Sequence, residues 1–459
     1  MNHERKLIMS ILIKNAKAII TMNDNNDVIY NENLFINGKI IEYIGTDIKD
    51  SDRVIDATDM YVYPGLINTH HHLYQTFTRN LPEVQNMELF PWLKYLYEIW
   101  KHLDDEVIYL SSLVGMGELV KYGCTTVFDH HYVFRSDLEC DFISVQMKAA
   151  KDLGVRFHAS RGSMSLGVKD GGLPPMSVVE SLEDIIKDSE RLIKIFHDTS
   201  KYSMNQIVLA PCSPFSVSDE LMVESAKLAR KYGVKLHTHL GETIDEEDYC
   251  LETSKERPLE YMERLGWLGE DVFFAHGIHF NDQELKKLSD TKTGIAHCPI
   301  SNQKLSSGIA RVSEMVKMDI PVGLAVDGSA SNDGSNLLAE LRAGYLLQRL
   351  KYSNDAITPQ GMLRITTRGG AELLGRNDIG YIKEGMAADI FMLDITRLQY
   401  VGTNKDPVAL LATVGVNHPV DYTIINGKII VKDGEVVTLN EKEIVKKSLK
   451  AYKEFRKEA

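Results

Sequence analysis

Several side chains that bind metal ions follow short β-type runs in this sequence. His70-His71-His72 comes after Pro64–Thr69, His237-Thr238-His239 ends a run that begins at Val234, His276 follows Asp271–Ala275, and Asp327 follows Val322–Val326. Neutral imidazole and carboxylate groups suit Zn²⁺ or Fe²⁺, and a ligand position kept open for water makes such a site hydrolytic rather than structural. Glu242, three residues after His239, adds a carboxyl group for proton transfer. The pattern predicts a hydrolytic metal site.

The spacing of His70 and His72 places both side chains on one face of a strand, because strand side chains alternate between two faces. Two imidazoles so placed can chelate one ion. His237 and His239 have the same spacing, so the residues alone leave either pair as a chelate. Any one of these histidines by itself would more often be a hydrogen-bonded core residue. Their recurrence at the ends of several strands favours the metal site.

Such ligands need a scaffold that brings the ends of distant strands together. Four further strand-like runs, separated by helical stretches, join the four named above: Thr125–Phe128, Val155–Ala159, Ile207–Ala210 and Ile295–His297. Eight strands that alternate with helices predict an α/β fold, a (β/α)₈ barrel of the TIM type, whose catalytic residues lie at the C-terminal strand ends. We expect this catalytic barrel to span residues 64–383.

Both ends of the chain have a different sequence pattern, in which short strand-like runs alternate with turns. Strand-like runs at 11–13, 18–21, 33–36 and 40–44 are matched near the other end by 388–393, 422–425, 428–431 and 435–438. Asn37-Gly38 and Asn426-Gly427 are hairpin signals. We expect residues 1–63 and 384–440 to pair into one small β-sandwich, and residues 441–459 to form a C-terminal helix.

The composition is that of an acidic enzyme with a small-molecule substrate. Lys and Arg number 52 against 65 Asp and Glu, a net charge of −13, which argues against nucleic acid or an anionic membrane as partner. The five cysteines, Cys124, Cys140, Cys212, Cys250 and Cys298, are scattered and form no CxxC pair, so neither a disulfide framework nor a thiolate zinc site is indicated. With no signal peptide and no long apolar span, we expect a cytoplasmic location.

The stretch from Pro82 to Asp105 is long for a connection between a strand and a helix, and it is rich in aromatic residues at partly helical spacing. It is either a lid over the barrel mouth or a helix buried against the barrel or a second subunit. The acidic run Asp245–Asp248 is interpreted as a solvated face.

Three motifs resemble the amidohydrolase superfamily, specifically its mononuclear deaminase branch: Pro64–His72, His239-Leu240-Gly241-Glu242 and Val326-Asp327-Gly328. Gly385–Ile390 is similar to the flanking sandwich of that family. Within the branch, His71–Arg79, Ser160–Gly167 and Gly171–Pro175 resemble the 8-oxoguanine deaminases. Aminohydrolases of guanine, of pterins such as isoxanthopterin and of hydroxytriazines share much of this pattern. The motifs therefore do not decide which heterocycle is the substrate.

The resemblance implies that His70, His72, His239 and Asp327 bind one divalent metal ion, Zn²⁺ or alternatively Fe²⁺. It implies catalytic roles for Glu242, His276 and Asp327, and it favours a homo-oligomer. His237 would then lie behind the ligands, and His71, His130 and His131 would be packed or hydrogen-bonded rather than ligating.

Two absences narrow the chemistry. Binuclear amidohydrolases bridge two metals with a carboxylated lysine at the end of the fourth strand, where this chain has Val208–Ser213 without a lysine. The cytidine-deaminase fold uses a Pro-Cys-x-x-Cys site, and the run Pro211–Pro214 lacks the second cysteine. We therefore expect one metal and a different fold from that of cytidine deaminase.

The expected reaction is hydrolytic deamination of an amino-substituted oxopurine. A divalent metal lowers the pKa of a bound water from about 15.7 to near 7. Asp327 would accept the proton, Glu242 would protonate a ring nitrogen, and His276 would orient the water and stabilise the developing oxyanion. Gln75 and Arg161 are candidates for binding the ring, because an amide offers a donor and an acceptor and a guanidinium offers a rigid donor fork. Their alternatives are a loop-bracing amide and an ion pair.

Two other functions have the same fold. Some proteins of this architecture serve as non-catalytic scaffolds, but these usually lack several ligands, and here every ligand position is filled. Hydrolysis of a cyclic amide, as in dihydroorotase-like enzymes, would be expected to need the bridging lysine that is absent.

Overall fold

The structure is a computed structural model of the chain that describes residues 9–135, 137 and 141–458. The first eight residues of the expected sandwich, Cys140, and residue 459 of the expected C-terminal helix lie outside this described part.

Eight parallel strands form the central sheet, and each pairs with the next strand in chain order. They are β8 (Leu66–Asn68), β10 (Cys124–Asp129), β11 (Arg156–Ser163), β12 (Asn205–Pro211), β13 (Lys235–Leu240), β14 (Val272–His276), β15 (Gly294–His297) and β16 (Val322–Leu324). Apolar side chains such as Phe128, Val208 and Phe273 fill the interior, as expected for strands that are buried on both faces. The predicted (β/α)₈ barrel is confirmed.

The barrel closes between its first and last strands. The backbone N–H of Thr69 donates to Leu324 O (3.2 Å), and just beyond this point β9 (His71–His72) pairs with β17 (Asp327–Gly328). The backbone N–H of Asp327 donates to His70 O (3.1 Å) in the same seam. Candidate metal ligands are therefore part of the segments that close the barrel.

Helices surround the strands. They include α2 (Asp105–Lys121), α3 (Phe142–Leu153), α4 (Leu182–Phe196), α5 (Asp219–Tyr232), α6 (Ile244–Thr253), α7 (Pro258–Arg264), α8 (Asp282–Thr291), α9 (Pro299–Lys304), α10 (Val312–Lys317), α11 (Ser329–Asn332), α12 (Leu337–Tyr352), α13 (Pro359–Arg364) and α14 (Gly370–Leu373). Their ends are set locally: the Ser218 hydroxyl accepts from Leu221 N at the start of α5, and Gly233 ends the helix in the left-handed conformation.

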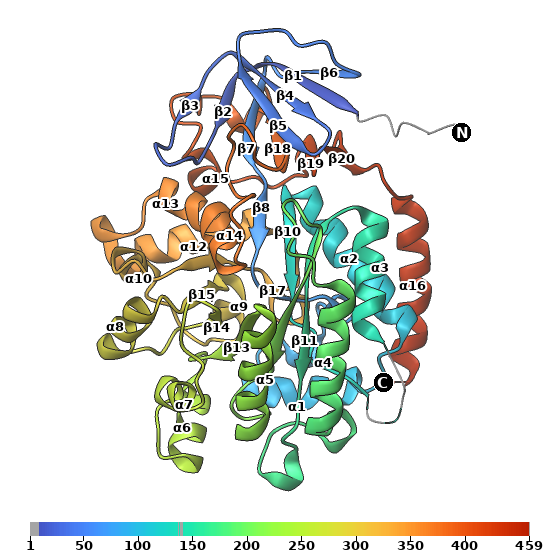
Figure 1. Cartoon of the computed structure of the whole chain (residues 1–459), viewed down its shortest axis with the longest axis vertical. Helices are drawn as coiled ribbons and strands as arrows, with labels where there is room; N and C mark the ends of the chain where they lie inside the picture. The colour runs from blue at the N-terminus through green and yellow to red at the C-terminus, as the bar shows by residue number, and fades with distance from the viewer. Residues whose placement is uncertain (1–8, 136, 138–140, 459) are drawn as a thin grey trace.

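Two sheets built from the chain ends cover one end of the barrel, at the top of Figure 1. One contains β1 (Ser10–Ala16), β4 (Glu32–Asn37), β5 (Ile40–Gly45) and β6 (Arg53–Asp56); the other contains β2 (Ala18–Ile20), β3 (Val28–Ile29), β7 (Met60–Pro64), β18 (Ile390–Asp394), β19 (Tyr422–Ile425), β20 (Lys428–Lys432) and β21 (Glu435–Val436). The antiparallel pairing of β7 with β18 joins the two ends of the chain in one sheet. The division into domains at residues 63 and 384 remains our proposal.

The segment between Pro82 and Asp105 contains a 3₁₀ turn, η2 (Pro82–Val84), and helix α1 (Leu89–Trp100). Helix α1 lies at the end of the barrel away from the terminal sheets (Figure 1). Trp92 and Trp100 are buried and meet edge to face, with ring centroids 5.6 Å apart. The last helix, α16 (Glu441–Glu458), packs along α2. Among the described residues, no helix is both long and apolar enough to cross a membrane.

Candidate active site

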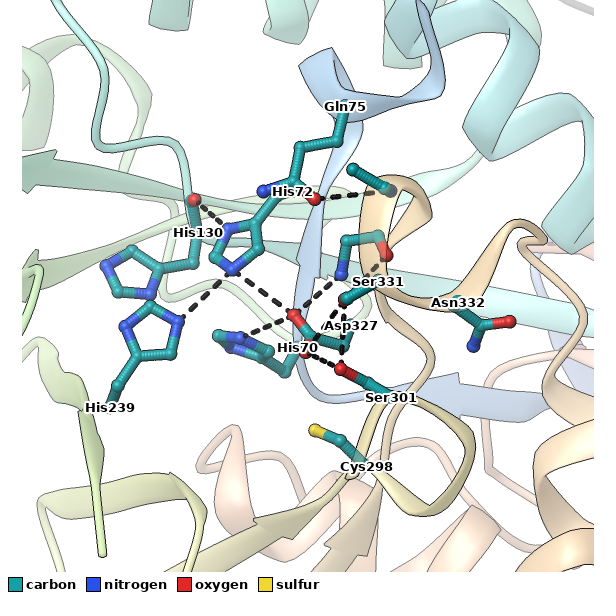
Figure 2. A network of polar contacts seen from close by, with 12 residues as sticks. His70, His72, Gln75, His130, His239, Cys298, Ser301, Asp327, Ser331 and Asn332 are labelled. Atoms are coloured by element: carbon teal, nitrogen blue, oxygen red, sulfur yellow. Dashed lines mark hydrogen bonds and ion pairs between the residues drawn. The ribbon is translucent and has the colours of Figure 1, made fainter. Parts of the chain in front are cut away.

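Three imidazole rings and one carboxylate converge inside the barrel mouth, as Figure 2 shows for His70, His72, His239 and Asp327. Nε2 of His72 lies 3.1 Å from Nε2 of His239. Oδ1 of Asp327 lies 3.3 Å from Nε2 of His70 and 3.3 Å from Nε2 of His72. All four side chains are buried, with at most 9% exposed. The four predicted ligands are brought together.

The proton on His70 is placed by His237. Nδ1 of His237 lies 2.9 Å from Phe273 O, and because a carbonyl oxygen only accepts, this nitrogen carries the proton. Burial lowers the pKa of His237 well below its usual range, so the ring is neutral and its Nε2 accepts from Nδ1 of His70 (2.8 Å). Burial likewise lowers the pKa of His70 to about 3. Nε2 of His70 therefore presents a lone pair toward Asp327.

The other two histidines are held in the same tautomer by backbone carbonyls. Nδ1 of His72 donates to His130 O (2.7 Å), and Nδ1 of His239 donates to Cys212 O (2.7 Å). With the proton of each ring on Nδ1, the Nε2 atom has a lone pair that can bind a metal ion. Hydrogen bonds of this kind fix the tautomer and orientation of metal-binding histidines.

This donor set fits a divalent cation. Three nitrogen lone pairs beside a carboxylate oxygen repel one another unless a positive charge lies between them. Tetrahedral ligands about 2.0–2.1 Å from Zn²⁺ would lie roughly 3.3–3.4 Å from each other. Three of the six distances between these ligand atoms, 3.1, 3.3 and 3.3 Å, are close to that spacing. The ligand atoms are thus arranged for one metal ion of that size.

Two residues of the site have a backbone conformation that non-glycine residues rarely adopt. The φ angles of His276 and Asp327 are +73° and +62°. Such left-handed residues concentrate where surrounding contacts over-determine the chain, which is typical of active sites. β14 ends at His276, and Asp327 begins the short strand β17, three residues after the end of β16.

The second oxygen of Asp327 is held by two hydroxyls. Ser301 Oγ donates to Oδ2 (2.5 Å), and Ser331 Oγ lies 3.3 Å from the same atom (Figure 2). Both serines are buried. One carboxylate oxygen of Asp327 thus faces the histidines while the other is fixed by hydroxyl donors.

Glu242 and His276 face each other beside this cluster. Oε2 of Glu242 lies 3.4 Å from Nε2 of His276, which is 3.9 Å from Oδ2 of Asp327. Nδ1 of His276 donates to Asn302 Oδ1 (2.9 Å), so Nε2 is directed at the two carboxyl groups. Burial, with the nearby charge of Asp327, raises the pKa of Glu242 well above its usual range. Glu242 is therefore suited to carry and deliver a proton.

The loop that carries Glu242 is held by Glu246, which corrects the interpretation of Asp245–Asp248 as a solvated face. The carboxylate of Glu246 accepts from Gly241 N (3.1 Å) and Glu242 N (2.9 Å), and the residue is 1% exposed. Burial raises its pKa to about 7. This part of the acidic run braces the active site.

A pocket leads to the cluster. Its lining joins the metal-site residues to Gln75, Tyr132, Cys212, Phe215, Leu305 and Ser331, together with Leu89, Trp92 and Leu93 of α1. Helix α1 is therefore both buried against the barrel and a wall of the pocket. Whether it also forms a subunit contact stays a prediction.

The structure places Gln75 in this pocket. Its Oε1 accepts from Ala330 N (3.3 Å), while its buried Nε2 interacts with the Tyr74 hydroxyl but has no partner of normal hydrogen-bond geometry within the described part of the chain. Gly328 is required for this arrangement, because a Cβ there would lie 1.9 Å from Oε1 of Gln75. The amide thus retains one unused donor.

The structure does not bring Arg161 to the pocket, and this assignment is corrected. Its guanidinium donates to Asp188 Oδ2 (2.7 Å) and Glu180 Oε1 (2.8 Å) and lies 3.8 Å from the ring centroid of Phe134. The residue is buried. The ion-pair alternative describes Arg161, because its donors are used inside the protein.

The remaining histidines make internal hydrogen bonds. Nε2 of His71 lies 2.9 Å from Ser335 Oγ, and the rings of His130 and His131 donate from Nε2 to Ala210 O (2.7 Å) and Val133 O (3.0 Å). His130 lies near enough to the ligands to share their cluster, and its ring stacks on His239 at 4.8 Å.

Sequence reasoning missed several pocket and supporting residues. Ser301 and Asn302 follow His297-Cys298-Pro299 as part of a polar run after a strand, and that position was a signal. Tyr132 and Cys212 also follow strands, but neither belongs to a metal-binding pattern. Trp92 lay within the aromatic segment without being singled out.

Comparisons with known proteins agree with this geometry. The Amidohydrolase family model matches residues 61–430. The chain is 46% identical to 8-oxoguanine deaminase of Pseudomonas aeruginosa, over 88% of this chain and 90% of that protein. It is 41% identical to hydroxydechloroatrazine ethylaminohydrolase of Pseudomonas sp. (strain ADP), over 88% of this chain and 84% of the relative.

A solved structure gives the same result in three dimensions. Atrazine chlorohydrolase TrzN from Arthrobacter aurescens TC1, complexed with zinc, superposes with a TM-score of 0.93 at 31% identity. The match covers 96% of this chain and 100% of the atrazine chlorohydrolase chain. The barrel, the donor set and these relatives lead to one conclusion: the chain belongs to the amidohydrolase family.

Proposed function

We propose that this protein is a metal-dependent hydrolytic deaminase of an amino-substituted oxopurine, and that it converts 8-oxoguanine and water to urate and ammonia. The observation that carries the reaction type is the buried carboxyl group of Glu242 beside His276 and the metal-ligand set. The 46% identical relative named 8-oxoguanine deaminase supports the substrate.

His70, His72, His239 and Asp327 would hold the metal. Bound there, the ion would supply Lewis-acid activation of water at neutral pH. Zn²⁺ is proposed because the similar atrazine chlorohydrolase was solved with zinc, and Fe²⁺ is the alternative because the same ligands accept it.

The proton transfers are assigned to the chain's own residues. Asp327 would accept a proton from the attacking water, and its Oδ2, fixed by Ser301, keeps the carboxylate oriented during this step. Glu242, whose pKa is raised by burial, would donate a proton to the ring nitrogen next to the attacked carbon. His276 would orient the water and stabilise the oxyanion, and Asp327 would protonate the departing amine to release ammonia.

Gln75 would bind the ring. Its unused Nε2 donor in the pocket matches a carbonyl oxygen of an oxopurine, because a buried amide without an acceptor is costly unless a ligand supplies one. The hydroxyl of Tyr132 and the thiol of Cys212 lie in the same lining and are further candidates for polar contacts with the ring.

A second ring class is supported by a specific relative. The 41% identical hydroxydechloroatrazine ethylaminohydrolase acts, by its name, on a triazine, so a hydroxytriazine is the second candidate substrate. Guanine and isoxanthopterin remain alternatives, the latter with a relative at 32% identity. A homo-oligomeric state and a cytoplasmic location stay predictions.

The test is ammonia release by metal-replete protein from 8-oxoguanine, guanine, isoxanthopterin, cytosine and hydroxyatrazine. The largest kcat/KM for 8-oxoguanine would support the proposed substrate. Activity on one of the other rings only would support the proposed mechanism and refute 8-oxoguanine as the substrate. A metal-loaded protein that deaminates none of the five would contradict the proposal and favour a scaffold.

A further inference from the structure

Helix α1 supplies much of the apolar side of the pocket. Leu89, Trp92 and Leu93 line it together with residues of the metal cluster. The space between the lining residues amounts to about 370 Å³ and opens to solvent. A polar group that faces this space either pairs within the protein or is available to a ligand.

The three tryptophans of the chain differ in how their indole N–H groups are used. Nε1 of Trp100 donates to Thr78 Oγ1 (3.2 Å), and Nε1 of Trp267 donates to Met222 O (2.9 Å). Trp92 is only 3% exposed, and its buried Nε1 has no acceptor among the residues described. Buried indole N–H groups usually find a partner, so this orphan needs an explanation.

The ring of Trp92 is held in a defined relation to the metal-site segment. It meets Trp100 edge to face at 5.6 Å with an interplanar angle of 74°. Trp100 in turn is tied to Thr78, whose hydroxyl donates to Gln75 O (2.9 Å). His72 and Gln75 lie in the same short segment as Thr78. Trp92 is therefore held, through Trp100 and Thr78, next to the candidate metal ligand His72 and the proposed ring-binding residue Gln75.

We propose that the indole N–H of Trp92 donates a hydrogen bond to a ring acceptor of the substrate, a carbonyl oxygen or an unprotonated nitrogen of the heterocycle. The inference rests on the proposed function. Trp92 and Gln75 both line the pocket, and each has a buried nitrogen donor without a hydrogen-bond partner among the described residues. Two such donors match a ring that carries acceptors on more than one edge. A ring without such an acceptor leaves the N–H unpaired and is bound more weakly.

The variant that isolates this contact is Trp92→Phe, which removes the N–H and keeps an aromatic ring against Trp100. We expect kcat/KM for the best substrate to fall about tenfold, mainly through KM. The thermal midpoint should stay the same or rise, because the free protein loses an unsatisfied buried donor. The matched control is Trp267→Phe, which deletes the satisfied internal hydrogen bond to Met222 O outside the pocket lining and should lower the thermal midpoint while changing kcat/KM less.

A second measurement reads the contact in the wild-type protein and does not depend on turnover. In ¹⁵N-indole spectra of the wild-type zinc-loaded protein, adding the heterocycle should move the Trp92 N–H resonance downfield and leave that of Trp267 in place. Trp92→Phe serves to assign the signal.

The outcomes separate the two proposals. If the wild type turns over substrate and Trp92→Phe has the same kcat/KM, the proposed hydrogen bond is refuted but the deaminase proposal is not. The same holds if the Trp92 resonance does not move with any of the five rings. If the wild type turns over none of the rings but its Trp92 resonance still shifts, the deaminase proposal is refuted and the contact is supported.

Discussion

Replacing His237 should weaken metal binding without touching a ligand. In the structure, Phe273 O fixes the proton of His237 on Nδ1, and Nε2 of His237 then fixes the proton of His70 on Nδ1. In His237→Phe, His70 has no acceptor behind it, and its proton can move to Nε2, where it would bond Asp327 at 3.3 Å and block the ligand atom. Losing such a hydrogen bond typically costs about 10–100-fold in metal affinity, which is about 1.4–2.7 kcal/mol.

The assay is competition for Zn²⁺ between the protein and a chelator of known affinity, read as the bound fraction at several chelator concentrations. His237→Gln should recover part of the affinity, because an amide oxygen can accept from His70. His297→Phe is the matched control: His297 is a buried histidine whose two ring nitrogens find no partner in the described structure, so its removal should leave the affinity within about twofold. Unchanged affinity in His237→Phe would refute the role of the hydrogen-bond chain, as would an equal loss in the control.

Three further predictions concern proton transfer and pH. Glu242→Gln should retain the metal by elemental analysis and lose at least about 100-fold in kcat, as for a general acid; loss of the metal would make Glu242 a ligand. Ser301→Ala should reduce kcat by about tenfold through the lost hydrogen bond to Asp327, with metal content unchanged, whereas an empty site would show that Ser301 acts on metal binding. Glu246 has a pKa raised from 4.5 to about 7 by burial, so the folded state holds this proton more tightly than the unfolded chain, and stability should fall as pH rises from about 4.5 to 7. Urea unfolding of Glu246→Gln should show a weaker fall over that range, and an identical pH profile would contradict the assignment.

The barrel strands could be predicted because they are short apolar runs, and the candidate ligands because several of these runs end in or are followed by a histidine or an aspartate. The sequence did not separate His237 from His239, since both point to the same face of β13. Two residues along a strand amount to about 6.6 Å, so His237 lies one layer deeper and meets the back of His70 rather than the metal.

Other features depended on contacts between distant residues. The pairing of Arg161 with Glu180 and Asp188 joins β11 to the segment from Glu180 into α4, and nothing near Arg161 in the sequence indicates it. The burial of Glu246 arises because the start of α6 folds back over the loop of Glu242. The left-handed backbone of His276 and Asp327 is imposed by the barrel mouth, since neither residue type requires it.

The closing seam of the barrel links the metal site to the completeness of the fold. Thr69 and Leu324, which meet there, are 255 positions apart in the chain, so the seam joins the first strand of the barrel to the last. Because His70 and Asp327 lie in that seam, the unfolded or partly closed chain has no complete ligand set. Metal binding then favours only the closed barrel, and a chelator should speed hydrogen exchange first at the amides of Thr69 and Asp327, well before the strands on the far side of the barrel open.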